Sequence, residues 1–289
     1  MKADLHFHPS FFSPKTAYSW LKNLPGRFEH VTERRTPSLY EVAAKAVENL
    51  DLLAVTSCSS KDHQDLRWQE YQRQAQQSER TFELRHPQMI VFHTGNTPVS
   101  GYEPGVIYLI HGQELKTDVG DLNILFAEQN VPIQKTDGTL EEVLRAARDS
   151  GDNVLIGINE LSRFQRRPAE IELMYEDGKI DFLEMWNALA ILRWNLESYE
   201  IAEKTHLPKI AVSDAHRIHD VGSAHIYNSA TLPNDLTYEK LAKKISQDIR
   251  TQNFGLHEGE IPFSGKALYS IRLGEAILGN QVKKLLPKL

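Results

Sequence analysis

The strongest constraint on the fold of this chain is a series of short apolar segments separated by longer amphipathic ones. Several of the short segments are apolar almost throughout, as in parallel strands that are covered on both faces. The segments with strand length and strand composition are Asp4–His8, Leu52–Thr56, Met89–His93, Val106–Glu114, Leu122–Ala127, Val154–Ile158, Phe182–Trp186, Ile210–Asp214 and His225–Asn228. This pattern predicts a sheet whose strands are largely buried.

Helical periodicity fills the intervals between these segments. One helix is expected to begin at Thr36-Pro37-Ser38, and another to begin at Thr139, with Glu142 as capping-box partner, and to end at Gly151. Further helices are expected over residues 64–85, 191–205 and 236–251. Strands that alternate with helices indicate βαβ units and a parallel sheet. No glycine-rich phosphate-binding sequence follows the first strand, so a barrel is favoured over an open doubly wound sheet.

The length of the chain suits one α/β barrel. It has 289 residues, and such barrels typically have about 250. No long repeat or linker divides the chain, so a single domain over residues 1–289 is predicted, with an irregular insert at 10–35 and a C-terminal extension at about 252–289. The sequence assigns no role to this insert or to the polar segment 64–85.

Composition excludes several classes of protein and of site. The single cysteine, Cys58, excludes an internal disulfide framework and a cysteine-rich zinc site, whereas twelve histidines leave room for imidazole ligands. The net charge of −6 gives no basic footprint for nucleic acid. The N-terminus lacks the apolar core of a signal peptide, and no apolar run is long enough to span a membrane, so a cytoplasmic protein is predicted.

Two strand ends carry side chains that can bind a metal ion. His6 and His8 lie two residues apart at the end of the first strand and therefore share one face. Asp214 and His216 have the same spacing after another apolar strand. Barrel enzymes carry their catalytic groups at such carboxyl ends of strands. Either pair alone is also compatible with partly buried polar residues of an ordinary strand.

A third strand end carries a single acid. Glu114 follows the apolar run Val106–Ile110, and a buried carboxylate needs a partner because isolation from water is costly. That partner is either a metal ion shared with the histidines or a basic side chain in a salt bridge. The three strand ends taken together favour the metal ion.

These strand ends belong to a set of ordered motifs that resembles the PHP (polymerase and histidinol phosphatase) superfamily, from residue 4 to about residue 225. The motifs are Asp4-Leu5-His6-Phe7-His8, Thr36–Glu41, Gly112-Gln113-Glu114, Thr139–Val143, Phe182–Asn187, and Ser213–His216 with Asp220–Gly222. Their order and spacing make the resemblance specific. It implies a distorted (β/α)7 barrel, similar to a TIM barrel, for this chain.

The resemblance also implies which residues hold metal. Members of the superfamily hold a cluster of three ions, and the first ion is bound mainly by the residues that correspond to His6, His8, Glu114 and Asp214. His216 corresponds to a further ligand. These nitrogen and oxygen ligands suit Zn²⁺, Mn²⁺ or Fe²⁺. One well-made metal site is therefore expected here.

Three other imidazole ligands of the superfamily are replaced in this chain, by Cys58, Asn123 and Asn159. The second and third ions are then expected only if other residues compensate. Cys58 is either a thiolate ligand or a small buried apolar residue. His63 and Glu160 are the nearest substitutes. The alternatives are an exposed imidazole at His63 and a Glu160 carboxylate that points away along its strand.

The resemblance implies a metal-dependent phosphoesterase acting on a small phosphorylated molecule or a nucleotide. His216 is the expected general acid or base, with Asp214 beside it in the catalytic group, because imidazole titrates near neutrality. Arg217 is the expected ligand of the substrate phosphate. Other basic residues near strand ends are Arg34, Arg35, Lys61, Arg163 and Arg193. No membrane partner is expected, and the sequence does not define an oligomeric state.

Two alternatives stay open. The loss of three imidazoles is also expected of a catalytically degenerate relative that binds a metal or a ligand without hydrolysis. A single metal ion in a barrel also supports other hydrolytic reactions, such as cleavage of C–N or C–O bonds. Retention of the ligands of the first ion favours an enzyme over complete decay of the site.

Overall fold

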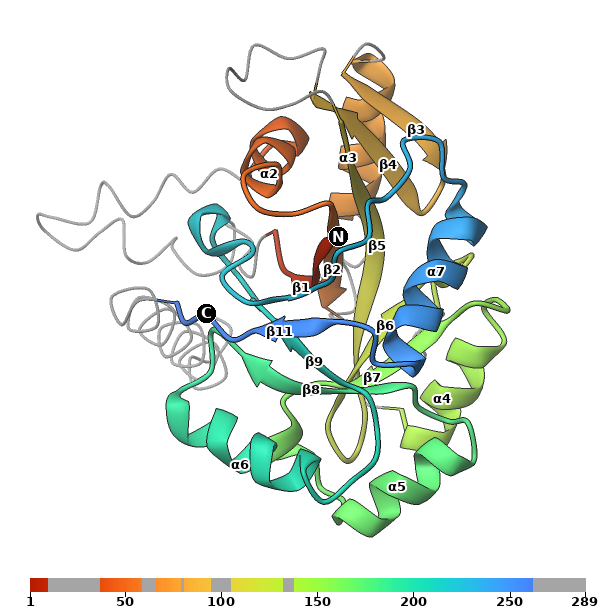
Figure 1. Cartoon of the computed structure of the whole chain (residues 1–289). Coiled ribbons are helices and arrows are strands. Elements are labelled where there is room, and N and C mark those ends of the chain that lie inside the picture. Colours follow the sequence, from red (N-terminus) through yellow and green to blue (C-terminus); the bar gives the residue numbers. More distant parts are fainter. Residues whose placement is uncertain (10–36, 59–65, 79–80, 95–104, 132–137, 262–289) are drawn as a thin grey trace, which may run out of the picture.

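The computed structural model describes residues 1–9, 37–58, 66–78, 81–94, 105–131 and 138–261 (Figure 1). The strands are β1 (Lys2–Phe7), β2 (Leu52–Cys58), β3 (Phe82–His86), β4 (Met89–His93), β5 (Val106–Lys116), β6 (Asp121–Leu125), β7 (Leu155–Ile158), β8 (Phe182–Asn187), β9 (Lys209–Val212), β10 (His225–Tyr227) and β11 (Gly255–His257). The helices are α2 (Leu39–Ala46), α3 (Leu66–Gln77), α4 (Leu140–Arg148), α5 (Pro168–Glu176), α6 (Leu192–Ala202) and α7 (Tyr238–Arg250), with short 3₁₀ helices η4 (Leu161–Arg163) and η5 (Ile218–Asp220). The predicted insert at 10–35 and residues 262–289 of the predicted extension lie outside the described residues.

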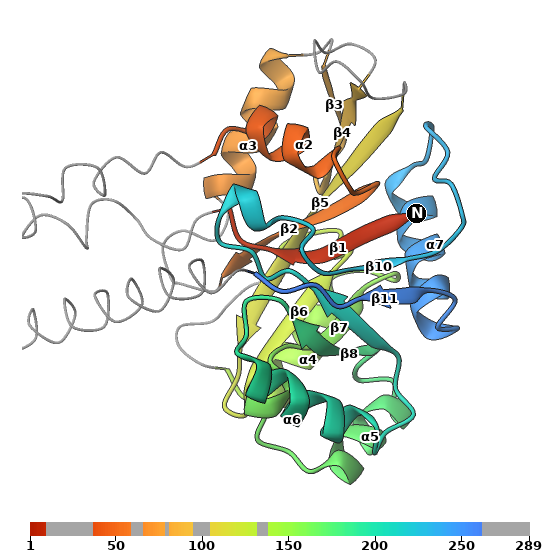
Figure 2. The same cartoon turned by 60° about the vertical axis from the view of Figure 1, so that its left-hand side comes forward.

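The strands form one sheet that curves into a nearly closed barrel (Figures 1 and 2). The strand order is β11-β10-β1-β2-β5-β6-β7-β8-β9, and the β3–β4 hairpin joins the sheet where β4 pairs with β5. The barrel closes between β1 and the residues after β9. There, Phe7 and Ala215 form a parallel bridge, and the His8 N–H donates to the Ala215 carbonyl at 2.9 Å. The predicted α/β barrel is confirmed.

The direction of the strands is less uniform than alternating βαβ units predict. β1, β2 and β5 run parallel, as do β7, β8 and β9, but β6 runs antiparallel to both β5 and β7. Only Thr117–Gly120 separates β5 from β6, and a connection this short cannot provide the crossover that parallel strands need. The expectation of a wholly parallel sheet is therefore wrong.

The periodicity and capping residues in the sequence predicted most of the helices correctly. The capping boxes form at Ser38 with Glu41 and at Thr139 with Glu142. The sequence prediction missed α5 and β11, and it extended the helix at 64–85 over residues that form β3. In β3, apolar and charged side chains alternate with the two-residue period of a strand in the sequence Phe-Glu-Leu-Arg.

The alternation of side chains along β1 separates the apolar core from the polar interior of the site. Ala3 and Leu5 belong to a buried cluster that includes the apolar face of α7. Asp4, His6 and His8, on the other face, are also buried. Buried polar groups require partners, so the partners of these three side chains define the site.

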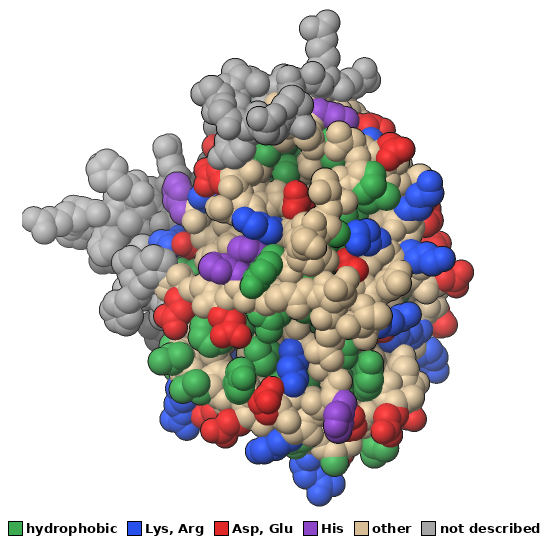
Figure 3. Space-filling model, in the orientation of Figure 1, with side chains coloured by type: hydrophobic (Ala, Val, Ile, Leu, Met, Phe, Trp, Pro, Cys, Tyr) green, Lys and Arg blue, Asp and Glu red, His purple; other side chains and the backbone are tan. Residues whose placement is uncertain are grey.

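No helix among the described residues is long and apolar enough to cross a membrane. On the face shown in Figure 3, acidic and basic side chains are interspersed.

Candidate metal centre

Three histidines of the site are each oriented by a hydrogen bond at Nδ1. His6 Nδ1 lies 2.9 Å from Glu184 Oε2, and His8 Nδ1 lies 2.9 Å from the Thr56 carbonyl oxygen. His216 Nδ1 lies 2.9 Å from the Asp214 carbonyl oxygen. Because these oxygens can only accept, each Nδ1 donates its proton. The Nε2 atom of each ring is then the atom that can bind a metal ion, as in metal sites whose histidines donate to outer oxygen atoms.

Nε2 atoms and carboxylates converge at the end of β1. His6 Nε2 and His8 Nε2 are 2.8 Å apart, and Asp214 Oδ1 lies 3.7 Å from the first and 3.5 Å from the second. These three residues are the described group whose ligand atoms lie close enough together to hold one ion. Glu114 Oε2 is 3.5 Å from His8 Nε2 on another side.

The contact between His6 and His8 is a test of whether a metal ion fits. With Nδ1 donating in both rings, two lone pairs would face each other at 2.8 Å, which is repulsive unless a proton or a cation lies between them. Burial lowers the pKa of His6, but the Asp214 and Glu184 carboxylates outweigh burial and raise that pKa to about 10. Burial lowers the pKa of His8 well below its usual value. Without metal, His6 therefore donates its second proton to His8, and a divalent cation suits the same place.

Two residues of β8 that the sequence prediction did not assign to the site hold its ligands in position. Glu184 accepts from His6, as described above, and the Asn187 side-chain amide donates to both Glu184 Oε1 and Asp214 Oδ2 at 2.9 Å. Both residues are buried. They lie in the motif Phe182–Asn187, so the resemblance itself contained the signal, but the prediction used that motif only to align the chain.

Asp214 and His216 reach the site from a turn and not from a strand. β9 ends at Val212, and Asp214 has a left-handed backbone with φ of +46°. The prediction that both side chains face the same way is fulfilled, since the His8 and His216 ring centroids are 4.8 Å apart. The turn, rather than strand alternation, produces this placement.

Asp4 supports the site through hydrogen bonds to the backbone. Its carboxylate accepts from the backbone N–H groups of Ser213 at 3.1 Å and of Gly222 at 3.0 Å. These hydrogen bonds fix the turn that carries Asp214 against β1. Burial raises the pKa of Asp4 to about 6.

The replaced imidazole positions lie around Glu114. In register, Cys58 of β2 and Asn123 of β6 both flank Glu114. Asn123 Nδ2 donates to the Leu5 carbonyl at 3.0 Å, and Asn159 Nδ2 lies 3.4 Å from Glu114 Oε1. The two amides thus hydrogen-bond within the barrel at positions where the resemblance implies imidazoles. The side chain of Cys58, and all of His63, lie outside the described residues.

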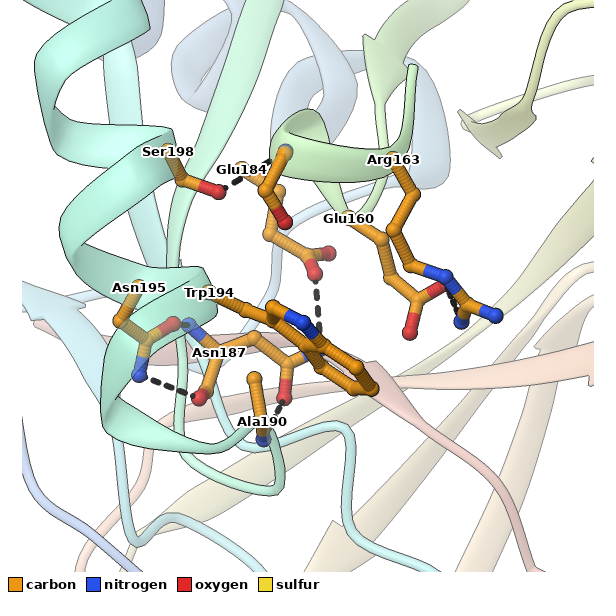
Figure 4. Close-up of a pocket in the computed structure, with 9 residues that line it drawn as sticks. Glu160, Arg163, Glu184, Asn187, Ala190, Trp194, Asn195 and Ser198 are labelled. Carbon is orange, nitrogen blue, oxygen red and sulfur yellow. Dashed lines mark hydrogen bonds and ion pairs between the residues drawn. The ribbon is translucent and has the colours of Figure 1, made fainter.

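The basic candidates have different surroundings. Arg217 donates from Nε and Nη2 to the two carboxylate oxygens of Asp220, at 2.6 and 2.8 Å. Arg193 pairs with Glu197 on the exposed side of α6. Arg163 lines a pocket (Figure 4). Arg34, Arg35 and Lys61 lie outside the described residues.

The side chain of Glu160 does not point in the direction that strand alternation predicts. β7 ends at Ile158, and Glu160 has a left-handed backbone with φ of +41°, so its side chain does not follow the alternation of the strand. It lines the pocket in Figure 4 together with Glu184 and Asn187, the two residues that hydrogen-bond to the candidate metal ligands. The expectation that Glu160 points away from the site is therefore wrong.

Comparison with known proteins gives a family match and a shared fold. A family model described as PHP-associated matches residues 193–237, a stretch that includes β9 and Asp214. No curated protein matches the chain. A solved two-domain protein from Bacteroides vulgatus, which contains a predicted PHP-like metal-dependent phosphoesterase, is similar with a TM-score of 0.51 and 14% identity, over 90% of this chain and 65% of that one. PsfC from Pseudomonas syringae is 14% identical, with a TM-score of 0.47 over 87% of this chain and 98% of that one.

Similarity at 14% identity establishes the fold alone, whereas the family match adds a sequence signature around two of the predicted ligands, Asp214 and His216. The shared barrel and this signature agree with the motifs found in the sequence. The chain resembles the PHP superfamily in these motifs, and it carries a PHP-associated signature over residues 193–237.

Proposed function

We propose that this protein is a metal-dependent phosphoesterase that acts on a small phosphorylated molecule or a nucleotide. The observation that carries the proposal is the pair of Nε2 atoms of His6 and His8, 2.8 Å apart and each within 3.7 Å of Asp214 Oδ1. Such a cluster of buried nitrogen and carboxylate ligands is suited to a divalent transition metal.

In this proposal His6, His8 and Asp214 hold the ion, with Glu114 and His216 beside it. Zn²⁺, Mn²⁺ and Fe²⁺ all accept this donor set. A bound divalent ion supplies a Lewis acid that polarises a phosphoryl oxygen and lowers the pKa of water. The carboxylate of Glu184 and the amide of Asn187 keep the ligands in fixed orientations, which is the usual role of groups behind metal ligands.

The chain's own residues supply proton transfer and charge for the reaction. Burial lowers the pKa of His216 to about 4, so the ring is neutral near pH 7. Because its Nδ1 proton is donated to the Asp214 carbonyl, Nε2 is the atom at which His216 would accept a proton as general base. Burial makes this atom a weaker base than an ordinary imidazole, contrary to the expectation of titration near neutrality. Arg217 is the proposed phosphate ligand, through the Nη atom that it does not use in its hydrogen bonds to Asp220.

One ion is proposed, because the positions of the further imidazole ligands are taken by amides. The hydrogen bond from Asn159 to Glu114 also favours a second candidate, a protein that binds a metal or a ligand without hydrolysis. In that case the amides would have replaced the ligands of a catalytic cluster and kept only its first ion.

Metal analysis and a phosphatase panel test the proposal. Protein purified without added metal is expected to hold about one tightly bound ion per chain, which is lost in His6→Ala. Hydrolysis of small phosphoesters is expected to fall about 100-fold or more in that variant, since a Lewis acid lowers such barriers by several kcal/mol. The matched control is His206→Ala, which removes an imidazole that is 93% exposed and pairs with Glu172 on the surface.

Each contrary outcome overturns a definite part of the proposal. Hydrolysis that is unaffected by His6→Ala would refute the site assignment. Three ions in the wild type would refute the inference that the amides exclude further metal. A chain that binds one ion but hydrolyses no phosphoester would be the non-hydrolytic binder.

A further inference from the structure

Helix α6 carries a stripe of apolar side chains on the side that faces away from the barrel. Leu192, Leu196 and Tyr199 are 51%, 54% and 44% exposed, and their spacing of four and three residues places them on one face of the helix. Figure 3 shows hydrophobic side chains at the surface over α6, with acidic side chains beside them. Single exposed leucines are ordinary at a protein surface, but three aligned apolar residues indicate a contact surface.

The inner side of α6 is polar, so the usual amphipathic arrangement is reversed in this helix. Asn195 and Ser198 are buried. The Asn195 side chain accepts from the Asn187 N–H at 3.0 Å and donates to the Asn187 carbonyl at 2.9 Å, and Ser198 Oγ accepts from the Ser162 N–H at 3.0 Å. A surface helix normally buries its apolar stripe, whereas α6 packs on the barrel through hydrogen bonds and leaves that stripe outside.

The described part of the chain ends beside the start of α6. The Ile261 N–H donates to the Ala188 carbonyl at 3.2 Å, and the two side chains belong to one buried cluster. Ala188 lies three residues before Ile191, the N-cap of α6. Residues 262–289 therefore start within reach of the stripe. A helix of 11 residues is about 16 Å long, so these 28 residues (289 − 261) are enough to run along all of α6.

The sequence of residues 262–289 has an apolar pattern that matches the stripe. Four of its apolar residues follow one another at intervals of seven, four and three, a spacing typical of one helix face. They are Ile271, Leu278, Val282 and Leu285. An apolar stripe on this segment and an apolar stripe on α6 can cover each other, and the contact removes both from water.

The charges of the two surfaces are also complementary. Residues 262–289 contain five basic residues and one acidic residue, so they have a net charge of +4, although the whole chain has a net charge of −6. From Leu192 to its C-cap Glu203, α6 has three acidic residues and one basic residue. Glu200 and Glu203 are exposed, and Glu203 pairs with Lys209. A basic apolar segment suits this surface because opposite charges favour the correct register of two packed elements.

We propose that residues 262–289 pack along α6 of the same chain, with their apolar residues on Leu192, Leu196 and Tyr199. A second copy of the chain competes for the same stripe, but the attachment at Ile261 gives the chain's own segment the higher effective concentration. The contact holds α6 from outside, while Asn195 holds it to β8 from inside. This proposal does not depend on the proposed function.

Hydrogen–deuterium exchange of the full chain tests the proposal. In the wild type, the backbone amides of residues 262–289 are expected to exchange more slowly than those of an unfolded chain. In Leu192→Gln/Leu196→Gln they are expected to exchange about tenfold faster or more than in the wild type, since two apolar contacts are lost. The control is Leu173→Gln, which alters a leucine of α5 that is 58% exposed.

The reciprocal variant, Leu278→Gln/Val282→Gln, is expected to speed exchange of the α6 amides, and it replaces the first variant if that one fails to fold. Exchange of residues 262–289 that is the same in the wild type and in Leu192→Gln/Leu196→Gln would refute the proposal, as would rapid exchange of this segment in the wild type. Protection that appears only at protein concentrations where sedimentation shows a dimer would assign the stripe to a second copy and overturn the proposal.

Discussion

At the scale of residues, one proton and one cation would compete for the same place in the proposed metal centre. His6 and His8 share a proton across 2.8 Å, and that proton stays on His6 because the Asp214 and Glu184 carboxylates raise its pKa to about 10 against the effect of burial. A metal ion must displace it, since an imidazole binds metal only through an unprotonated nitrogen.

This competition predicts the pH dependence of metal binding. Because His6 keeps its second proton up to about pH 10, metal affinity should rise about tenfold per pH unit between about pH 7 and 9, with about one proton released per ion. Calorimetric titration in two buffers of different ionisation enthalpy measures that proton directly. An affinity that does not change with pH over this range would contradict the shared proton.

The variant Glu184→Gln tests the same shared proton from the side of its partner carboxylate. The amide keeps the shape of the side chain but removes one carboxylate from His6, so the pKa of His6 falls and fewer protons are released. Metal affinity is also expected to fall about 10- to 100-fold, as for other groups that orient metal-bound histidines. Glu172→Gln is the control, because Glu172 pairs with the exposed imidazole of His206.

At the scale of elements, the contact between β7 and β8 fixes the strand that carries Glu184. Gly157 of β7 lies directly against Phe182 of β8, and a Cβ atom there would stand 2.0 Å from the ring. The ring is buried, so either it or the paired strand would have to shift to make room. The position of β8, and with it of Glu184, therefore depends on the absence of a side chain at residue 157.

Substitution of that glycine is expected to be strongly destabilising. Gly157→Ala should lower the free energy of unfolding by about 3 kcal/mol or more, the upper range for overpacking a core. Gly178→Ala is the comparison, because nothing lies within 4 Å of a Cβ there and only its φ of +67° opposes the change, at about 1 kcal/mol. Denaturant unfolding of both variants measures the difference. Equal losses would mean that the ring of Phe182 moves aside.

The arrangement of the strands also shows which features of the site could be predicted from the sequence and which could not. The strand end with His6 and His8 was predictable, because alternation along one strand decides which side chains share a face. Glu160 was not, since β7 stops two residues earlier and a left-handed residue redirects the chain. The antiparallel direction of β6 depends on a short turn, and the role of Glu184 depends on a partner 178 positions away in the sequence.

At the scale of the whole molecule, Asp4 joins the first strand to the last part of the barrel. Its carboxylate accepts from Ser213 and Gly222, which lie on the segments that follow β9 and η5. Removal of this carboxylate leaves the backbone N–H groups of Ser213 and Gly222 without their hydrogen-bond acceptor. The same removal loosens the turn that presents Asp214.

Asp4→Ala should therefore reduce stability and metal content together. Each buried N–H left without a partner costs about 1 to 3 kcal/mol, so a loss of about 3 kcal/mol is expected. Asp51→Ala is the control, since Asp51 is 43% exposed and accepts a hydrogen bond from the Lys2 backbone. Calorimetric unfolding and metal analysis of both variants test this. A stable Asp4→Ala that keeps its metal would show that the bridge at Ala215 suffices.

The pKa of Asp4 gives the sign of a further pH effect on stability. Burial raises it from 3.8 to about 6, so the folded protein binds this proton more tightly than the unfolded chain does. The free energy of unfolding should then fall as the pH rises from about 4 to 6 through this group, and the fall should be absent in Asp4→Ala. Unfolding curves collected across that range check the sign.

The closure of the barrel through Phe7 and Ala215 has a consequence for synthesis. The ligands on β1 leave the ribosome first, and Asp214 follows 206 positions after His8 (214 − 8). A nascent or truncated chain that stops before β9 lacks Asp214 and His216, so the proposed metal centre would be incomplete in it. If the proposed ion binds there, tight metal binding would follow the synthesis of β9 and the turn that carries Asp214.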